Sequence, residues 1–145
     1  MGTRSVATKV ISVVVGVLFV LGASATSGAT RAAATKMSPL IMTCGGKTVY
    51  EPSSYVISCA DANSSLVSIH WTWWTHSFAT AIATYSLNDC TPDCAAGKFH
   101  SYAARVSFST PRLTKYGTLY SRLRVIYLVG SKTHTMVTTL PLRPL

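Results

Sequence analysis

Apolar and small polar residues alternate through much of the chain, which is the pattern of β-strands with one buried face. In one such stretch, Tyr102, Ala104, Val106 and Phe108 occupy alternate positions and Arg105 lies between them. No long segment has the period of an amphipathic helix. The pattern predicts six strands, over Ser54–Cys59, Leu66–Trp74, Ala79–Ser86, Ser101–Ser109, Leu119–Val129 and His134–Leu140.

Strict alternation also assigns the faces of the second predicted strand. It places Val67, Ile69, Trp71 and Trp73 on one face, with His70 and Thr72 on the other. Because Trp71 and Trp74 are three positions apart, a buried Trp71 implies an outward Trp74. Trp74, beside His70, is therefore the candidate exposed aromatic contact residue. The alternative is that the loop after this strand end, through Phe78, covers the ring.

The fifth predicted strand carries the arginines. Alternation places its apolar residues on the core face and the intervening residues outward. With Arg105 of the fourth strand, the outward residues form a basic face next to an aromatic patch around Trp74. The expected core residues are Leu119, Leu123, Val125 and Tyr127, and the expected outward residues are Tyr120, Arg122 and Arg124.

Turn-forming residues separate the predicted strands. Asp61–Ser65, Asn88–Gly97 and Pro111–Gly117 contain the Asp, Asn, Ser, Pro and Gly residues that favour turns. Short strands at this spacing are typical of packed antiparallel sheets. The sequence predicts an all-β fold, a small antiparallel β-sandwich of about six to seven strands with two disulfides; a partly open β-barrel is the alternative.

The beginning of the chain has the order of an export signal. Arg4 and Lys9 give a positive start, Val10–Leu21 is apolar, and Ala23-Ser24-Ala25 offers small residues to a peptidase. The apolar run is shorter than the roughly 20 residues of a membrane-spanning helix. We expect cleavage after Ala25, secretion, and no stable membrane span afterwards; an uncleaved membrane anchor is the alternative.

Cleavage there leaves one domain's length of chain. Residues 1–25 are the predicted signal peptide and residues 26–38, rich in Ala, Thr, Ser and Gly, a flexible leader. Residues 39–145 are the predicted single β domain, which is too short for two comfortable cores.

All four cysteines follow the predicted signal, which suits a disulfide-held exported domain. Four cysteines allow three pairings. We favour Cys90 with Cys94, closing a tight loop around Pro92, and Cys44 with Cys59. Zinc and redox sites usually space cysteines by two residues and need further ligands, so we expect neither metal nor cofactor.

Three motifs occur in order: Cys59-Ala60-Asp61, Trp71-Thr72-Trp73-Trp74 and the decapeptide Asn88-Asp89-Cys90-Thr91-Pro92-Asp93-Cys94-Ala95-Ala96-Gly97. In these motifs the chain resembles a family of small secreted actinobacterial proteins without an assigned activity. The resemblance covers about Cys44 to Pro111 and implies export and a disulfide-held domain. Trp73 and the longer basic C-terminal half are not part of the motifs on which the resemblance rests.

Charge is distributed unevenly. The 13 Lys and Arg and four acids give a net charge of +9, which becomes +7 when Arg4 and Lys9 leave with the signal. All four acids precede Gly97, and eight Lys and Arg follow it. A field of one sign concentrates polyanions and also keeps an exported protein soluble.

Residues that resemble catalytic groups have simpler roles. Asp61 and Asp89 begin turns, where their carboxylates accept backbone hydrogen bonds. Asp61, Ser68 and His70 have the residue types of a hydrolase triad, but the sequence lacks the Gly-x-Ser-x-Gly nucleophile elbow, so the triad rests on residue types alone. The segment from Asp61 lacks the glycine and the closing Glu of a calcium loop. The remaining histidines, expected to be exposed or to lie on strand faces, are His76, His100 and His134.

No complete catalytic set appears, so the sequence predicts a secreted, non-enzymatic binding module. Expected partners are an anionic envelope polymer or another exported protein, without specific nucleic-acid binding. Its candidate contact residues are Trp74, His70, Tyr120, Arg105, Arg122 and Arg124. The alternative is a small secreted hydrolase that uses Asp61 or Asp89 with His70.

Overall fold

The computed structural model describes residues 38–144, and these residues contain no helix. The predicted signal peptide, and all but the last residue of the predicted leader, lie outside the described residues. Six strands form one antiparallel sheet in chain order, and two further strands of two residues each form a hairpin. The sheet consists of β3 (Tyr55–Val56), β4 (Ser64–Trp74), β5 (Phe78–Asn88), β6 (Phe99–Thr114), β7 (Gly117–Val129) and β8 (Lys132–Thr139); the hairpin consists of β1 (Ile41–Met42) and β2 (Thr48–Val49).

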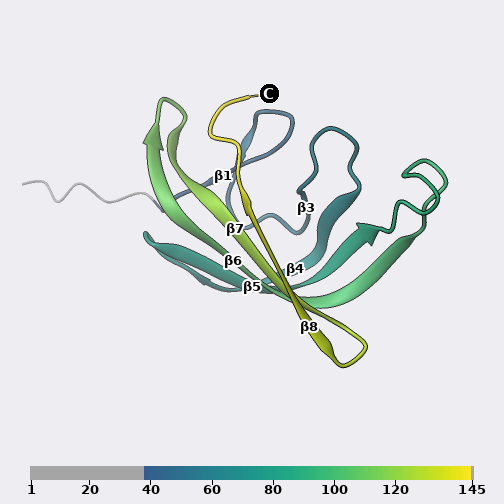
Figure 1. Ribbon diagram of the computed structural model, residues 1–145. Helices are drawn as coiled ribbons and strands as arrows, with labels where there is room; N and C mark the ends of the chain where they lie inside the picture. Colours follow the sequence, from purple (N-terminus) through teal and green to yellow (C-terminus); the bar gives the residue numbers. More distant parts are fainter. Residues whose placement is uncertain (1–37, 145) are drawn as a thin grey trace, which may run out of the picture. The chain divides into compact units, whose positions relative to one another are not determined.

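The larger sheet curls around β1 and the segment near β3 (Figure 1). Leu40 joins this inner segment to the sheet: its N–H donates to the Thr118 carbonyl (2.9 Å), and its carbonyl accepts from the Tyr120 N–H (3.0 Å). The predicted all-β antiparallel fold with two disulfides is confirmed. The main sheet curls into a half-barrel, which resembles the partly open β-barrel given as the alternative.

The core lies between the inner segment and one face of the sheet, called here the covered face. Cross-strand neighbours Ala81, Val106 and Val125 and the adjacent pair Phe108 and Leu123 are buried on it. The expected core face of β6 is therefore confirmed. Apolar burial of this kind is the main stabilising term of a small domain. Ile41 and Tyr55 complete the core from the inner segment.

Two β-bulges in β4 correct the predicted faces of this strand. The register shifts between Val67 and His70 and again between Trp71 and Trp73. Each extra residue reverses the alternation for the residues after it. Ile69 and Trp71 therefore face the core as expected, whereas Val67 and Trp73 are 39% and 64% exposed.

The same bulges bring Trp74 to the covered face, so its prediction as an outward contact residue is wrong. Its ring packs on Trp71, Tyr50 and Tyr120, with centroids 4.5, 4.8 and 5.6 Å away. Its indole N–H donates to the Pro39 carbonyl at 2.8 Å. Trp74 thus closes one end of the core.

Tyr120 is also buried rather than outward, with no exposed surface. The β6–β7 pair is irregular at Thr110, which has a φ of 56° and lies opposite Ser121. Beyond that bend Tyr120 packs on Trp74 and its hydroxyl donates to the Thr75 carbonyl. Burial raises the pKa of Tyr120 to about 12. Arg122 and Arg124 remain exposed, as expected.

Both predicted disulfides, Cys44–Cys59 and Cys90–Cys94, are confirmed. The first ties the β1–β2 hairpin region to the end of the β3 segment, and the second closes the loop between β5 and β6. The described cysteines leave no free thiol.

Reduction should destabilise the protein, and the longer loop should matter more. The Cys44–Cys59 loop spans 15 positions, for which chain entropy gives about 3 kcal/mol. The Cys90–Cys94 loop spans 4 positions, for which the same relation gives about 2 kcal/mol. Urea unfolding of Cys44→Ala/Cys59→Ala and Cys90→Ala/Cys94→Ala, each against wild type, measures both terms. A reduced protein as stable as the oxidised one would contradict this expectation.

Truncation of the neighbouring residues Trp73 and Trp74 should change the free energy of unfolding by very different amounts. Trp74→Ala removes a ring packed in the core and should lower the free energy of unfolding by about 3 kcal/mol. Trp73→Ala removes an exposed ring and should change it by less than about 0.5 kcal/mol. Urea unfolding of both variants tests the second bulge directly, because strict alternation from Trp71 would bury Trp73 and expose Trp74.

Candidate functional site

The second face of the main sheet, called here the open face, is the candidate site. Its central row runs across four strands through His70, Ile82, Arg105 and Ile126, which are partners in the sheet register. The next row contains Trp73 and Arg124. Trp73 and Ile82 are 64% and 57% exposed. This face therefore combines solvent-exposed apolar side chains with arginines.

A groove follows the open face. Its larger part has a volume of about 620 Å³ and is lined by Ser68, His70, Ile82, Arg105 and Ile126, among others. An adjoining part of about 410 Å³ shares Ile82, Arg105 and Ile126 and adds other open-face side chains. The added side chains include Thr72, Trp73 and Arg124.

Local irregularity in β4 shapes one wall of the groove. Ser68, at the first bulge, has a φ of 50°, which is uncommon for a residue with a side chain. The bulges point His70 and Trp73 to the open face, next to Ile82 and Thr80 of β5. Bulges commonly redirect side chains near functional sites in this way.

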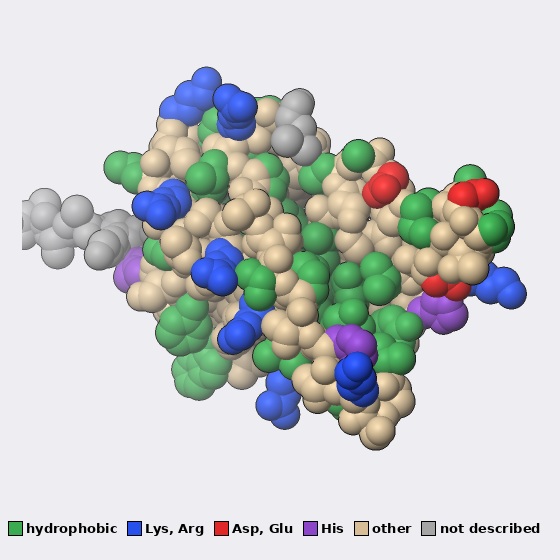
Figure 2. Space-filling view, in the orientation of Figure 1, with side chains coloured by type: hydrophobic (Ala, Val, Ile, Leu, Met, Phe, Trp, Pro, Cys, Tyr) green, Lys and Arg blue, Asp and Glu red, His purple; other side chains and the backbone are tan. Residues whose placement is uncertain are grey.

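The open face is free of carboxylates, because strands β4–β8 contain no Asp or Glu. Figure 2 shows the acidic side chains gathered on one side of the molecule and most Lys and Arg elsewhere. Within the described range, Asp89 is the acid whose carboxylate contacts a basic side chain, through Oδ2 and His100 Nε2 at 2.9 Å. Arg105 and Arg124 therefore lie in the groove without a carboxylate on their face.

The structure thus unites three of the expected contact residues, His70, Arg105 and Arg124, in one groove. Arg122 lies on the same face, opposite Ser109, one row beyond the groove. Trp73, Ile82 and Ile126 were not expected as contact residues. The sequence does indicate an outward Ile82, because Ile82 alternates with Ala81 and Ala83. It contains no clear feature that predicts the bulge exposing Trp73.

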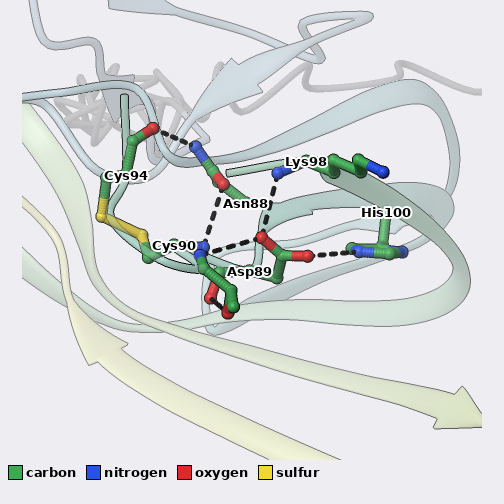
Figure 3. Close-up of polar contacts among 7 residues, drawn as sticks. Asn88, Asp89, Cys90, Cys94, Lys98 and His100 are labelled. Atoms are coloured by element: carbon green, nitrogen blue, oxygen red, sulfur yellow. Dashed lines mark hydrogen bonds and ion pairs between the residues drawn. A yellow bond between two sulfur atoms is a disulfide. The ribbon is translucent and has the colours of Figure 1, made fainter. Parts of the chain in front are cut away.

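The loop between β5 and β6 is a second polar cluster (Figure 3). Asn88 is buried; its Nδ2 donates to Asn63 Oδ1 (2.9 Å) and the Cys94 carbonyl (2.8 Å), and its Oδ1 accepts from the Cys90 N–H (3.0 Å). A Cβ at Gly97 would lie 2.2 Å from Asn88 Oδ1, so the loop needs glycine there. The decapeptide is thus a tightly bonded loop.

Asp89 holds the other side of this loop. Its Oδ1 accepts from the N–H groups of Thr91 (3.1 Å) and Lys98 (2.9 Å), and its Oδ2 lies 2.9 Å from His100 Nε2. The hydrogen bond with His100, followed by those from Lys98 and Thr91, lowers the pKa of Asp89 from 3.8 to about 2. Asp89 therefore builds the loop, as the turn interpretation expects.

The residues expected to act together in the alternative hydrolase lie in different parts of the structure. Asp61 accepts from the backbone N–H and the side-chain amide of Asn63, at 3.1 and 2.7 Å. Asp89 contacts His100, while His70 and Ser68 line the open-face groove. Asp61 thus makes the hydrogen bonds of a turn, and Asp89 links the two ends of the β5–β6 loop, so neither carboxylate is paired with His70.

The other histidines do not line the groove. His76 is exposed in the turn between β4 and β5. His134 stacks on Tyr127 with centroids 5.4 Å apart. Within residues 38–144, no group of three or more His, Cys, Asp and Glu side chains is placed to hold a metal ion.

Acid should weaken the fold through Asp89. Because the folded state lowers this pKa, the unfolded chain takes up a proton first as the pH falls, so stability decreases from about pH 4 towards pH 2. Asp89→Asn should flatten this part of the pH dependence. Thermal unfolding from pH 7 to pH 2 measures it, with Glu51→Gln as the charge-matched control. An unchanged slope in Asp89→Asn would contradict the role of this carboxylate.

Comparison of the chain with protein-family models, with curated proteins and with solved structures finds no match.

Proposed function

We propose that the protein is exported and acts as a non-enzymatic binding module that holds an anionic ligand of the cell envelope on its open face. The observation that carries the proposal is the placement of Arg105 and Arg124 in a groove whose strands contain no acid. Arginine binds phosphate and carboxylate groups through parallel hydrogen bonds, which gives geometry as well as charge.

Export is supported by independent features. Residues 1–25 have the charged start, apolar run and small residues of a signal peptide. The two disulfides are compatible with an oxidising compartment.

The electrostatics of the fold favour an anionic ligand over a neutral one. Asp61, Asp89 and Asp93 lie in loops, where their carboxylates accept backbone hydrogen bonds, and none of them lines the groove. The positive field of the open face is therefore not cancelled locally, and such a field raises both the local concentration and the association rate of anions.

Removing the two groove arginines should weaken binding to anionic ligands. We expect Arg105→Gln/Arg124→Gln to lower affinity for isolated cell walls and for polyphosphate, and to reduce its salt dependence, because fewer counterions are exchanged. Lys47→Gln/Lys98→Gln removes the same charge from exposed positions outside the groove and is the matched control. Binding is measured by co-sedimentation or titration over a salt series with protein exported by cells. Equal losses in both variants would contradict the groove as the site, and salt-independent failure to bind any of these anions would contradict the proposed function.

A further inference from the structure

The open face exposes more apolar surface than a purely polar ligand requires. Trp73 and Ile82 are more than half exposed, and Phe78 and Val137 are each 44% exposed. The sheet register places all four on the same face. Neighbouring exposed apolar residues on one face usually mark an interaction surface.

Arginines and apolar side chains lie next to one another on this face. Trp73, Ile82 and Phe78 lie on β4 and β5, while Arg105, Arg122 and Arg124 lie on the adjacent strands β6 and β7. Neighbouring strands are about 4.8 Å apart, so both kinds of group meet one surface within a few strand widths. A matching ligand offers anionic groups next to apolar ones.

We propose that the open face docks on the surface of an anionic bilayer, with Arg105 and Arg124 on lipid phosphates and Trp73 and Ile82 inserted between the headgroups. This inference rests on the proposed function and names its ligand class. A soluble polyanion satisfies the arginines but leaves Trp73 and Ile82 in water. A bilayer interface satisfies both, and tryptophan favours that boundary because its ring is apolar and its N–H is polar.

Charge argues against two other occupants of this face. A second copy would bring its own Arg105 and Arg124 towards those of the first, and like charges repel. The leader carries Arg31 and Lys36 and no acid, so it does not complement the arginines. An anionic lipid surface complements them.

The test uses the exported protein with vesicles of phosphatidylcholine alone and of phosphatidylcholine mixed with phosphatidylglycerol. We expect binding to the mixed vesicles, a blue shift in Trp73 fluorescence and protection of Trp73 from a water-soluble quencher. Trp71 and Trp74 already contact the core, so the change should disappear in Trp73→Phe. Phosphatidylcholine alone should bind weakly, because it offers no net negative charge.

Two double variants separate the two kinds of contact. Arg105→Gln/Arg124→Gln should lower the partition coefficient about fivefold per arginine. Trp73→Ser/Ile82→Ser should lower it about tenfold or more, and should lower polyphosphate affinity less, because polyphosphate offers no apolar groups to these two side chains. Circular dichroism confirms that each variant is folded; the wild-type vesicle comparison does not depend on the variants.

The outcomes distinguish this inference from the proposed function. Binding to polyphosphate without binding to mixed vesicles overturns the bilayer inference and leaves the proposed function standing. Failure to bind either ligand overturns both. A wild-type dimer in sedimentation that Trp73→Ser/Ile82→Ser dissociates assigns the face to a second copy and also overturns the bilayer inference.

Discussion

The register of β4 against β5 determines both the core and the candidate site. Side chains on a strand alternate between faces, so each bulge moves the following residues to the opposite face. Two bulges within this strand place Trp71 and Trp74 on the covered face and leave His70 and Trp73 on the open one. Trp74 then packs on Tyr120 and bonds to Pro39, which fixes the inner segment against the sheet. Burial of one tryptophan and exposure of its neighbour thus have the same origin.

Acidic and basic side chains lie in different parts of this fold, because the acids build loops and most of the described arginines lie on strands. The acids Asp61, Asp89 and Asp93 lie in loops and accept backbone hydrogen bonds there, as Asp residues commonly do in turns. The long strands β6 and β7 carry arginines at outward positions. A fold that places its acids in loops and its arginines on one strand face has a basic surface without neutralising partners. That surface is the physical basis of the proposed ligand class.

Sequence patterns predict regular parts of this fold well. The core face of β6 follows from unbroken alternation between Tyr102 and Phe108, and the disulfide partners are close in sequence. Trp74 and Tyr120 are different, because their orientation depends on irregularities in strand pairing. No residue type at Ser68 or Thr110 announces a positive φ, since glycine or asparagine is the usual signal. The groove was predictable through Arg105 and Arg124 but not through Trp73.

Indole N–H signals in an NMR spectrum test the central claim most directly, because the protein contains three tryptophans, of which Trp73 is the exposed one. On addition of phosphatidylglycerol-containing bicelles, we predict that the Trp73 signal shifts together with the Nε signals of Arg105 and Arg124. The signals of Trp71, Trp74 and Arg143 should stay in place. If the signals of Trp71, Trp74 or Arg143 shift while that of Trp73 stays in place, the open face is not the binding surface.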